Sequence, residues 1–461
     1  MKKIRVIFII IFILCLLLPA LGMPFFKKAV NSEKREPAKF PSLNFKTAAD
    51  GSFGKELENW AADHIGFRNS LIGINNALMR DVFGQQDADI KVLIGKDGWL
   101  YFKDDIKDYC NERTLSDRNI NNIAASLAML DGYIKEKGLE FEVCIVPNKS
   151  CLYEHMPSNY IKNEGEDNYR ALLKAFEKKG INHTDLFADF KADGRVLYRK
   201  EDTHWDYKGA LLAYNAIMKQ AGLSQHMLDN VGFGAETEDV GDLAQMLYLD
   251  KAEPEVLSYP ESGFSYETVS REKAANAIFL ETYNEKAEDC VLFYRDSYLD
   301  TMHIYCAESF GQAVFSRALP YDLSYVDKYM PKLTVLEIVE RNIADLAKRA
   351  PMMEASETAV SAAAETVGAD AIKLKSEKKN SYMHFYGEID ESLLGDEYRA
   401  YIYVNGGEAA SYEAFPVYEM ELLGSDKLKD NGFSAYIPAE KAENAEIYVI
   451  VESNGKYYMG N

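Results

Sequence analysis

The stretch RVLYRKEDTHWDYKGALLAYNAIMKQAG, residues 195–222, carries the clearest signal for the fold of this chain. Its first residues are apolar and strand-like, a polar loop follows, and apolar residues then recur at helical spacing. Ala210, Leu211, Tyr214 and Met218 share one face of that helix. The stretch therefore predicts a strand, a loop and a helix in succession, which is the repeating unit of an α/β domain.

Other stretches repeat this order. CVLFYRDSYLDTM (290–302) and KLTVLEIVERNIADLAKR (332–349) each begin as a strand and continue as a helix. FEVCIVPNK (141–149) is typical of a buried strand that ends at a proline, and helical spacing covers 117–136 and 166–178. Apolar strands that alternate with helices predict a mostly parallel sheet. In such sheets, chemistry collects in the loops at the carboxyl ends of the strands.

Two of these loops carry residues suited to acyl transfer. Ser297 directly follows the strand VLFY and precedes a helix, where backbone N–H groups could stabilise a developing oxyanion. A serine hydroxyl is a poor nucleophile until an oriented base takes its proton. Asp202 and His204 supply an orienting carboxylate and a base within one turn.

Each of these residues also has a purely structural interpretation. Asp296 or Ser297 could be a helix N-cap, and Asp202 or Thr203 could cap the following helix. His204 would then be a half-buried surface residue. The two loops together favour the functional interpretation, because they supply a nucleophile, a base and an orienting group.

The same two segments carry a resemblance to a known family. EDTHWDYKGA (201–210) resembles the D-x-H-W signature of the alginate O-acetyltransferase family, of the AlgJ/AlgX type, and of the related DHHW proteins; VLFYRDSY (291–298) resembles its nucleophile segment. The similarity covers about residues 50–345. It implies an SGNH-hydrolase-like, three-layer α/β domain with a mostly parallel sheet. Supporting segments occur in the family's order: DHIGFR (63–68), IGKDGWLYF (94–102), VPNKSCLY (146–153) and EIVERN (337–342).

Carried over residue by residue, the resemblance implies that Ser297 is the nucleophile, His204 the base and Asp202 the residue that orients it. Ordinary SGNH esterases place the serine first and the Asp and His near the C-terminus, three residues apart. Here the pair precedes the serine and is spaced by two, which matches the acetyltransferase branch. The family also implies a polysaccharide acceptor and a membrane-bound O-acyltransferase that supplies the acyl group.

We therefore expect a serine-dependent, extracytoplasmic O-acyltransferase that acetylates hydroxyls of an exopolysaccharide or cell-wall glycan through an acyl-serine intermediate. Two alternatives remain open. A carbohydrate esterase would use the same three residues, since the two reactions differ only in whether water or sugar reaches the acyl-enzyme. A non-catalytic binding or scaffold protein of a polysaccharide export complex is the other alternative, and the presence of all three residues counts against it.

Further residues near these loops are candidates for substrate contacts. Asn148 and Lys149 follow the strand CIVP and could donate to an oxyanion or hold a substrate hydroxyl, although Pro147-Asn148 is also a common turn. Trp205 could stack on a sugar or pack under its loop. His303 is a second candidate base. The remaining histidines lack metal-ligand spacing and no Gly-rich phosphate loop occurs, so we expect neither a metal nor a cofactor.

The N-terminus has the pattern of a membrane segment. Lys2, Lys3 and Arg5 precede an uncharged, mostly apolar run over 6–26. Such a run is long enough to cross a bilayer, and its end LLLPALGMPFFKK offers a poor cleavage site. We expect a signal anchor over 1–28, a stalk over 29–53 and a catalytic domain outside the cytoplasm; a cleaved signal is the alternative.

Charge and cysteine content narrow the class further. Net charge is −21, from 52 basic and 73 acidic residues, which argues against nucleic-acid binding because phosphates would be repelled. Five cysteines lie outside the apolar N-terminal run, with no CxxC pair. We expect mostly free, buried thiols, with one or two disulfides as the alternative.

The C-terminal part differs in composition from the rest. After the predicted catalytic domain (54–345), an Ala- and Glu-rich segment predicts a linker over 346–375. Tyr- and Val-rich runs separated by turn residues then predict a β-sandwich accessory domain over 376–461. Because the linker is expected to make few apolar contacts, a chain that ends near residue 350 is expected to fold alone.

Overall fold

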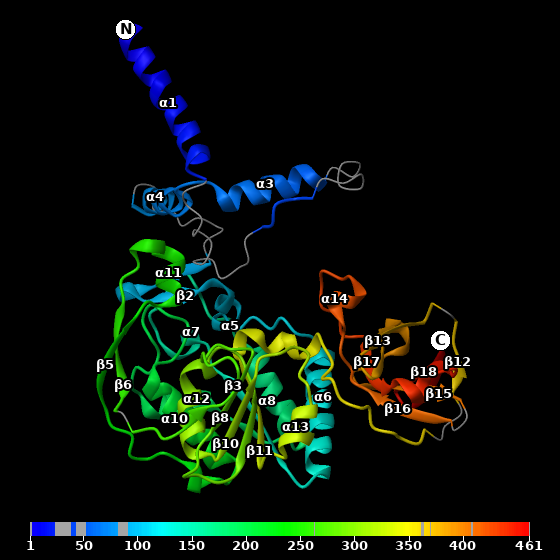
Figure 1. Ribbon diagram of the computed structural model, residues 1–461. Helices are drawn as coiled ribbons and strands as arrows, with labels where there is room; N and C mark the ends of the chain where they lie inside the picture. Colours follow the sequence, from blue (N-terminus) through cyan, green and yellow to red (C-terminus); the bar gives the residue numbers. More distant parts are fainter. Residues whose placement is uncertain are drawn as a thin grey trace.

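The computed structural model describes residues 2–23, 38–42, 52–81, 91–261, 263–360, 364–368, 370–406 and 409–460. A central α/β domain lies between an N-terminal helical segment and a C-terminal β-rich part (Figure 1). Most of the predicted stalk, and the end of the predicted signal, lie outside the described residues.

A seven-stranded sheet organises the α/β domain. Its strand order is β4-β3-β11-β9-β10-β8-β7. The pairs from β4 to β10 are parallel, whereas β8 pairs antiparallel with β10 and β7 antiparallel with β8. The sheet is therefore mixed, and the predicted mostly parallel sheet is confirmed only in part. The strands are β3 (Glu140–Val146), β4 (His183–Thr184), β7 (Glu267–Thr268), β8 (Phe279–Tyr283), β9 (Cys290–Tyr294), β10 (Gln312–Ser316) and β11 (Leu333–Val339).

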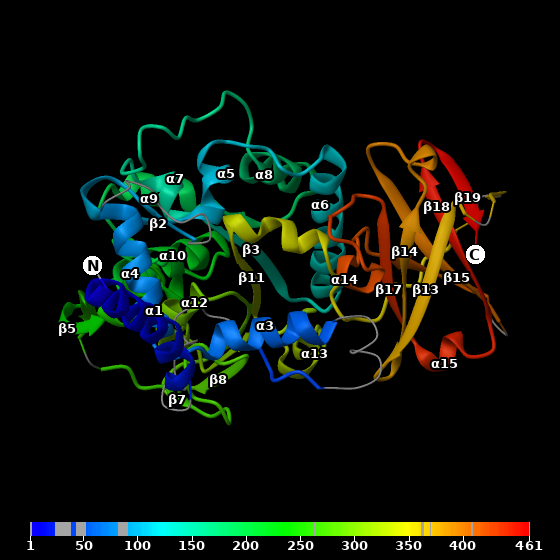
Figure 2. The same ribbon diagram turned by 90° about the horizontal axis from the view of Figure 1, so that it is seen from above.

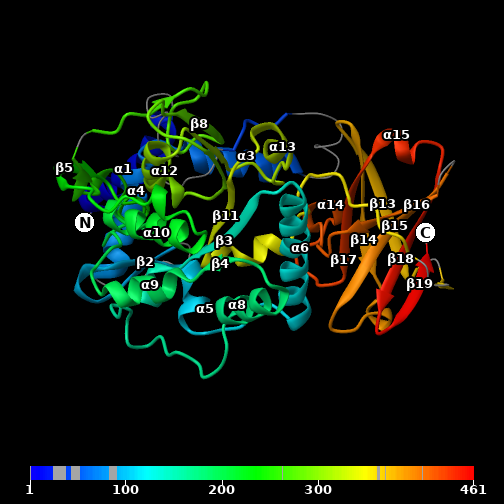
Figure 3. The same cartoon turned by 90° about the horizontal axis from the view of Figure 1, so that it is seen from below.

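Alternate residues of the central strands enter two separate cores. Val143 and Ile145 of β3 pack with helices α6 (Asp117–Glu136) and α8 (Asn168–Lys179). Cys144 of β3 points to the opposite face, and it packs there with helices and with the residues of β9, β10 and β11 that point the same way. This period of two places a buried strand between two apolar environments. The second set of helices is α9 (Leu186–Asp193), α10 (Tyr207–Gln220) and α12 (Leu299–Ser309), separated from α6 and α8 by the sheet in Figure 3.

Several elements match their predicted positions and one differs. β1 (Val92–Ile94) and β2 (Leu100–Phe102) form an antiparallel hairpin, as the two apolar runs around a glycine-bearing turn in 91–102 indicate. Residues 195–198 form no strand; Tyr198 makes a single antiparallel bridge with Trp205. Helical spacing over 54–83 is also present in the sequence, and the structure has two helices there, α3 (Ser52–His64) and α4 (Arg68–Asp81). Phe67, between them, takes a left-handed conformation with φ 60°.

Short elements complete the α/β domain. They are the helices α5 (Ile106–Tyr109), α7 (Lys149–Leu152), α11 (Asp242–Tyr248) and α13 (Ser324–Tyr329), the antiparallel hairpin β5 (Phe233–Asp239) and β6 (Glu255–Pro260), and the 3-10 helices Lys96–Gly98, Lys103–Asp105, Ser224–His226, Leu249–Lys251 and Glu340–Ala347.

The C-terminal part consists of two sheets around one apolar core. One sheet has the order β12-β19-β18-β15-β16 and the other β13-β14-β17. Phe385 and Phe433 of the smaller sheet share a buried cluster with Ile402 and Val449 of the larger one, which brings two sheet faces together (Figure 2). The elements are β12 (Glu365–Thr366), β13 (Ile372–Lys379), β14 (Tyr382–Ile389), Glu391–Leu393 (3-10), β15 (Tyr398–Asn405), β16 (Ala410–Ala414), α14 (Met420–Leu423), β17 (Gly432–Pro438), α15 (Ala439–Ala442), β18 (Glu446–Ser453) and β19 (Lys456–Gly460).

The segment predicted to be an exposed linker is buried in its first half. Ala350 is fully buried, and Met353 belongs to the same core as α6 and α8. Phe415, Val417 and Tyr436 of the C-terminal part belong to that core as well. The expectation of few apolar contacts is therefore wrong for residues 346–355. The physical reason is that small and apolar side chains there pack between the helices α6 and α8 and the C-terminal β-rich part, which Ala- and Glu-rich composition does not reveal.

The helix α1 (Lys2–Gly22) is the most apolar element. Within it, Arg5–Gly22 is long and apolar enough to cross a membrane. Its side chains from Val6 to Leu14 are largely exposed, and the helix extends away from the body of the protein (Figure 1).

Candidate functional site

Ser297 lies in the turn between β9 and α12, as the sequence predicts. The turn is held by Asp296, whose carboxylate accepts hydrogen bonds from the backbone N–H groups of Tyr298 (2.9 Å) and Val339 (2.8 Å). The N–H of Asp296 donates in turn to Glu337 Oε2 at 2.9 Å. These bonds tie the turn to the end of the neighbouring strand β11 and leave Ser297 itself half-buried.

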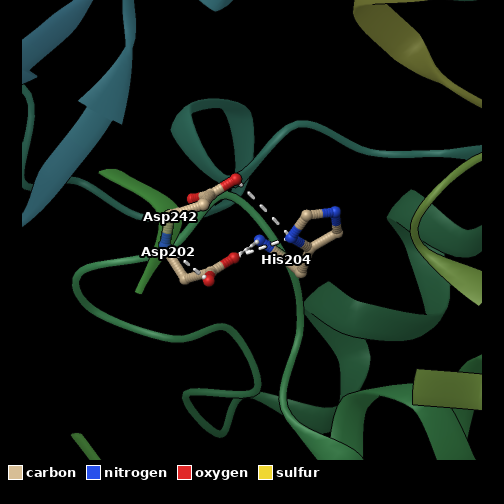
Figure 4. A group of neighbouring side chains, drawn as sticks. All are labelled: Asp202, His204 and Asp242. Atoms are coloured by element: carbon tan, nitrogen blue, oxygen red, sulfur yellow. Dashed lines mark hydrogen bonds and ion pairs between the residues drawn. The ribbon is translucent and has the colours of Figure 1, made fainter. Parts of the chain in front are cut away.

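The loop before α10 brings His204 to Ser297. His204 Nε2 lies 2.8 Å from Ser297 Oγ, and Nδ1 lies 2.7 Å from Asp202 Oδ1. Asp202 Oδ1 also accepts the backbone N–H of His204 at 2.9 Å, which fixes both the ring and its main chain (Figure 4). The three residues proposed from the sequence thus form one hydrogen-bonded chain. In this order the imidazole can take a proton from the serine while the carboxylate holds its other nitrogen.

The electrostatic setting keeps Asp202 ionised. Burial opposes its charge, but the hydrogen bond and charge of His204 and the charge of Arg199 outweigh burial, so the pKa of Asp202 lies well below its usual range. Arg199 Nη1 is 3.1 Å from Asp202 Oδ2, and both side chains are almost wholly buried. A permanently charged carboxylate is what an imidazole needs in order to become imidazolium during proton transfer.

Tyr298 and Trp205 are buried beneath the site and connect its two loops. The Tyr298 hydroxyl donates to the carbonyl oxygen of Thr203 at 2.7 Å, and Trp205 Nε1 donates to the carbonyl oxygen of Tyr298 at 3.0 Å. These reciprocal bonds join the serine turn to the histidine loop. Trp205 is fully buried and stacks on Phe190. Of the two roles considered for Trp205, the structure therefore has it packed under its loop, because a wholly buried indole does not stack on a sugar.

Asn148 and Lys149 also differ from their predicted role as substrate contacts. Asn148 is fully buried, its N–H donates to Glu340 and its side-chain amide donates to Asp108. Lys149 Nζ donates to the carbonyl oxygens of Arg199, Lys200 and Asp202. Because these donors are directed at protein acceptors, neither residue faces an oxyanion. Lys149 supports the histidine loop, and Asn148 is held by Asp108 and Glu340.

One group of side chains has metal-ligating chemistry within the described part of the chain: Asp202, His204 and Asp242. Their ligand atoms are already engaged. Both oxygens of Asp242 accept hydrogen bonds from Thr203, and both oxygens of Asp202 are bonded to His204, Asp242 or Arg199. The adjacent guanidinium also repels a cation. The donor set fits a histidine-orienting cluster better than a metal site.

Several residues of the site were not singled out in the sequence. Thr203 sits inside the recognised motif, yet its hydroxyl and N–H both donate to Asp242, which is remote in sequence. The Gly241-Asp242 pair before an apolar helical run was the available signal.

His303, the second candidate base, donates Nδ1–H to the carbonyl oxygen of Asp300 (2.8 Å), as a residue one turn inside α12 would.

The cysteines are unpaired, as expected. Those that the structure describes outside α1 are all free, and burial raises the pKa of the thiols of Cys144, Cys151 and Cys306 well above the usual value. A thiol held in the neutral form is a poor nucleophile.

Part of this chain is similar to known proteins. Residues 92–287 match the family described as "SGNH hydrolase-like domain, acetyltransferase AlgX", a range that contains Asp202 and His204 and ends before Ser297. The probable alginate O-acetylase AlgJ of Pseudomonas aeruginosa is 27% identical over 185 residues, which cover 37% of this chain and 44% of AlgJ. The chain thus matches less than half the length of the curated relatives.

Solved structures give weaker likenesses. The O-acetyltransferase domain of Pseudomonas putida AlgJ has a TM-score of 0.38 and 16% identity, over 55% of this chain and 92% of that domain. Bacillus cereus PatB1 has a TM-score of 0.41 and 18% identity, over 55% of this chain and 96% of PatB1. Over residues 92–287, this chain therefore has an SGNH hydrolase-like domain similar to that of the AlgJ/AlgX-like family.

Proposed function

We propose that this chain is an O-acyltransferase that moves an acyl group, acetyl in the first instance, onto hydroxyls of a polysaccharide outside the cytoplasm. Ser297 Oγ attacks the carbonyl carbon of the acyl donor while His204 Nε2 takes the hydroxyl proton. The bond from the acyl carbon to the donor's leaving group breaks, and His204 returns the proton to that group. A sugar hydroxyl then attacks the acyl-serine, its proton passes to His204, and Ser297 leaves protonated.

The observation that carries the proposal is the hydrogen-bonded chain through His204. One ring nitrogen lies 2.8 Å from a half-buried serine hydroxyl and the other 2.7 Å from an ionised, buried carboxylate. Both distances fall within direct proton-transfer reach. The serine also sits at the N-terminal end of the 11-residue helix α12, where the helix dipole favours developing negative charge.

The substrate classes are inferred from the relatives. A curated relative is named as a probable alginate O-acetylase, which supports a polysaccharide acceptor for this chain. An exported domain has no direct access to cytosolic acyl donors, so we propose that a membrane-bound O-acyltransferase delivers the acyl group to Ser297.

Substitution of the three residues tests the chemistry. In Ser297→Ala, His204→Ala and Asp202→Ala, we expect hydrolysis of 4-methylumbelliferyl acetate to fall by at least about 1,000-fold. Combining the substitutions should add little, because the residues act as a unit. Ser324→Ala, an exposed serine on α13, is the matched control. A fluorophosphonate should label Ser297 in the wild-type protein; near-normal turnover by Ser297→Ala would exclude this serine as the nucleophile.

A competition assay separates transfer from hydrolysis. With the activated ester as donor and a soluble oligosaccharide as acceptor, we expect mass spectrometry to detect acetylated sugar at the expense of free acetate. Acetate as the sole product across a panel of acceptors, with release of acetate from an acetylated glycan, would instead identify an esterase that uses the same residues.

We also propose that α1 tethers the protein to a membrane. Its apolar, exposed stretch supports this. The protein should remain in membranes during alkaline carbonate extraction, be digested by protease outside spheroplasts, and retain its first 26 residues. A mature N-terminus at or after Met23 would show that the segment is a cleaved signal.

A further inference from the structure

A second carboxylate lies beside His204. Asp242 begins α11, after the hairpin strand β5, and is distant in sequence from the histidine loop. Its Oδ2 lies 3.8 Å from His204 Nδ1, and its side chain is largely buried. We propose that Asp242 is a positioning residue for the reaction: it locks the loop that carries His204 and supplies a second negative charge that favours the imidazolium form. This inference rests on the proposed function.

The hydrogen bonds between Asp242 and the loop are reciprocal. Asp242 Oδ1 accepts the N–H of Thr203 and Oδ2 accepts its hydroxyl, both at 2.8 Å. In return the N–H of Asp242 donates to Asp202 Oδ2 at 2.9 Å. Asp242 therefore holds Thr203 through its carboxylate and holds the Asp202 carboxylate through its backbone N–H. Thr203 Oγ1 also lies 3.2 Å from His204 Nδ1. The two side chains that contact this ring nitrogen, Asp202 and Thr203, are therefore both hydrogen-bonded to Asp242.

The main chains of the two segments are in direct contact. A Cβ at Gly241 would lie 2.2 Å from the carbonyl oxygen of Glu201 and 3.1 Å from the N of Asp202. The N–H of Ala244 donates to that same carbonyl at 3.0 Å. Only a glycine at position 241 therefore allows α11 to approach the loop this closely. Asp242, the next residue, lies beside His204 because of this close approach.

Charged groups surround the loop that carries His204. Two buried cations face it: Arg199, which pairs with Asp202, and Lys149, which donates to the carbonyl oxygen of Asp202. Arg199 also pairs with Asp239 of β5 at 2.7 Å and with Glu255 of β6 at 3.3 Å, so its charge is shared with carboxylates that do not contact the imidazole. Asp242 places a negative charge 3.8 Å from His204 Nδ1, which favours the protonated ring. The other charged group packed around these residues is Asp105 of the preceding 3-10 helix.

The test removes the charge and keeps the shape. In Asp242→Asn we expect kcat/KM for the small ester to fall by about 10-fold or more at neutral pH, with KM little changed, and the acid limb of the pH–rate profile to move to lower pH by about 1 unit. Thr203→Val, which removes the hydroxyl and keeps the charge, should lower the rate without moving the limb. Glu238→Gln removes an exposed charge from the same hairpin and should match wild type.

An NMR titration makes the outcome independent of turnover. The ring resonances of His204 should titrate at lower pH in Asp242→Asn than in wild type or Glu238→Gln. An unmoved titration would overturn the electrostatic role, even if activity fell through loss of structure. Wild-type activity in Ser297→Ala would overturn the proposed function instead, and the titration would still decide the role of Asp242.

Discussion

Lys149 illustrates at the scale of a residue how a buried charge supports the histidine loop. Its ammonium group donates to three backbone carbonyls of residues 199–202 and lies near the rings of Trp99 and Tyr101. Burial lowers the pKa of Lys149 to about 8, against the opposing charges of Asp202 and Asp242. Three carbonyls converging on one point need a donor with three hydrogens, which only the protonated amine provides.

Replacement of this lysine should disturb catalysis without touching the reacting groups. In Lys149→Met the chain length is kept and the three donors are lost, so the loop relaxes; we expect kcat/KM to fall between about 10- and 100-fold. The wild-type rate should also decline above about pH 8, as the ammonium loses its proton, and the variant should lack this decline. The measurement is a pH–rate profile on the small ester. Equal rates and equal alkaline limbs in both proteins would contradict the role.

At the scale of elements, burial favours the protonated form of a carboxyl on β3, next to the edge strand β4 of the sheet. Glu142 of β3 is 1% exposed, and its Oε1 accepts a hydrogen bond from Thr184 of β4 at 2.6 Å. Burial raises the pKa of Glu142 to about 7. Between the unfolded pKa near 4.5 and this value, the folded protein holds a proton that the unfolded chain has released. The stabilisation is therefore complete below the unfolded pKa and is lost as pH rises through 7.

Glu142→Gln should remove that dependence while keeping the hydrogen-bond acceptor. We expect the free energy of unfolding of the variant to match wild type near pH 4.5 and to exceed it at pH 8 by on the order of 2 kcal/mol. Urea unfolding at the two pH values measures the difference. Glu140→Gln, at the exposed start of the same strand, is the control and should change neither value. Parallel pH curves for wild type and Glu142→Gln would show that this carboxyl is ionised in the folded protein.

At the scale of the whole molecule, the α/β domain and the C-terminal part share a core. Phe415, Val417 and Tyr436 pack in the cluster that also contains α6 and α8. Polar contacts surround this core: Arg118 of α6 bonds to Glu391 and Asp430. A surface that completes another domain's core is not an independent accessory surface.

A chain that ends at residue 350 should consequently be unstable. We expect it to aggregate or to melt well below the full chain, because it exposes the apolar face of α6. In the full chain, Phe415→Ala should lower the free energy of unfolding by about 3 kcal/mol or more. Calorimetry and urea unfolding measure both effects. A soluble fragment with the full chain's melting temperature and esterase activity would contradict the shared core and restore the exposed boundary expected from composition.

The local pattern of the sequence determined the strands β3, β9 and β11 and the helices α6 and α8, and it marked Asp202, His204 and Ser297 as candidate site residues. These depend on apolar periodicity and on residue types close together in the chain, so short windows contain the information. The same holds for the apolar α1 segment.

Only the tertiary structure decided what surrounds that group. Trp205, Asn148 and Lys149 have the chemistry of substrate contacts, but all three are buried. Partners from other segments make Trp205 and Lys149 supports of the histidine loop and hold Asn148 at Asp108. Asp242 joins His204 from a separate hairpin. The burial of residues 346–355 likewise depends on surfaces that meet only in the folded chain. Side-chain type sets what a residue can do, whereas its partners, which are set by long-range packing, decide what it does.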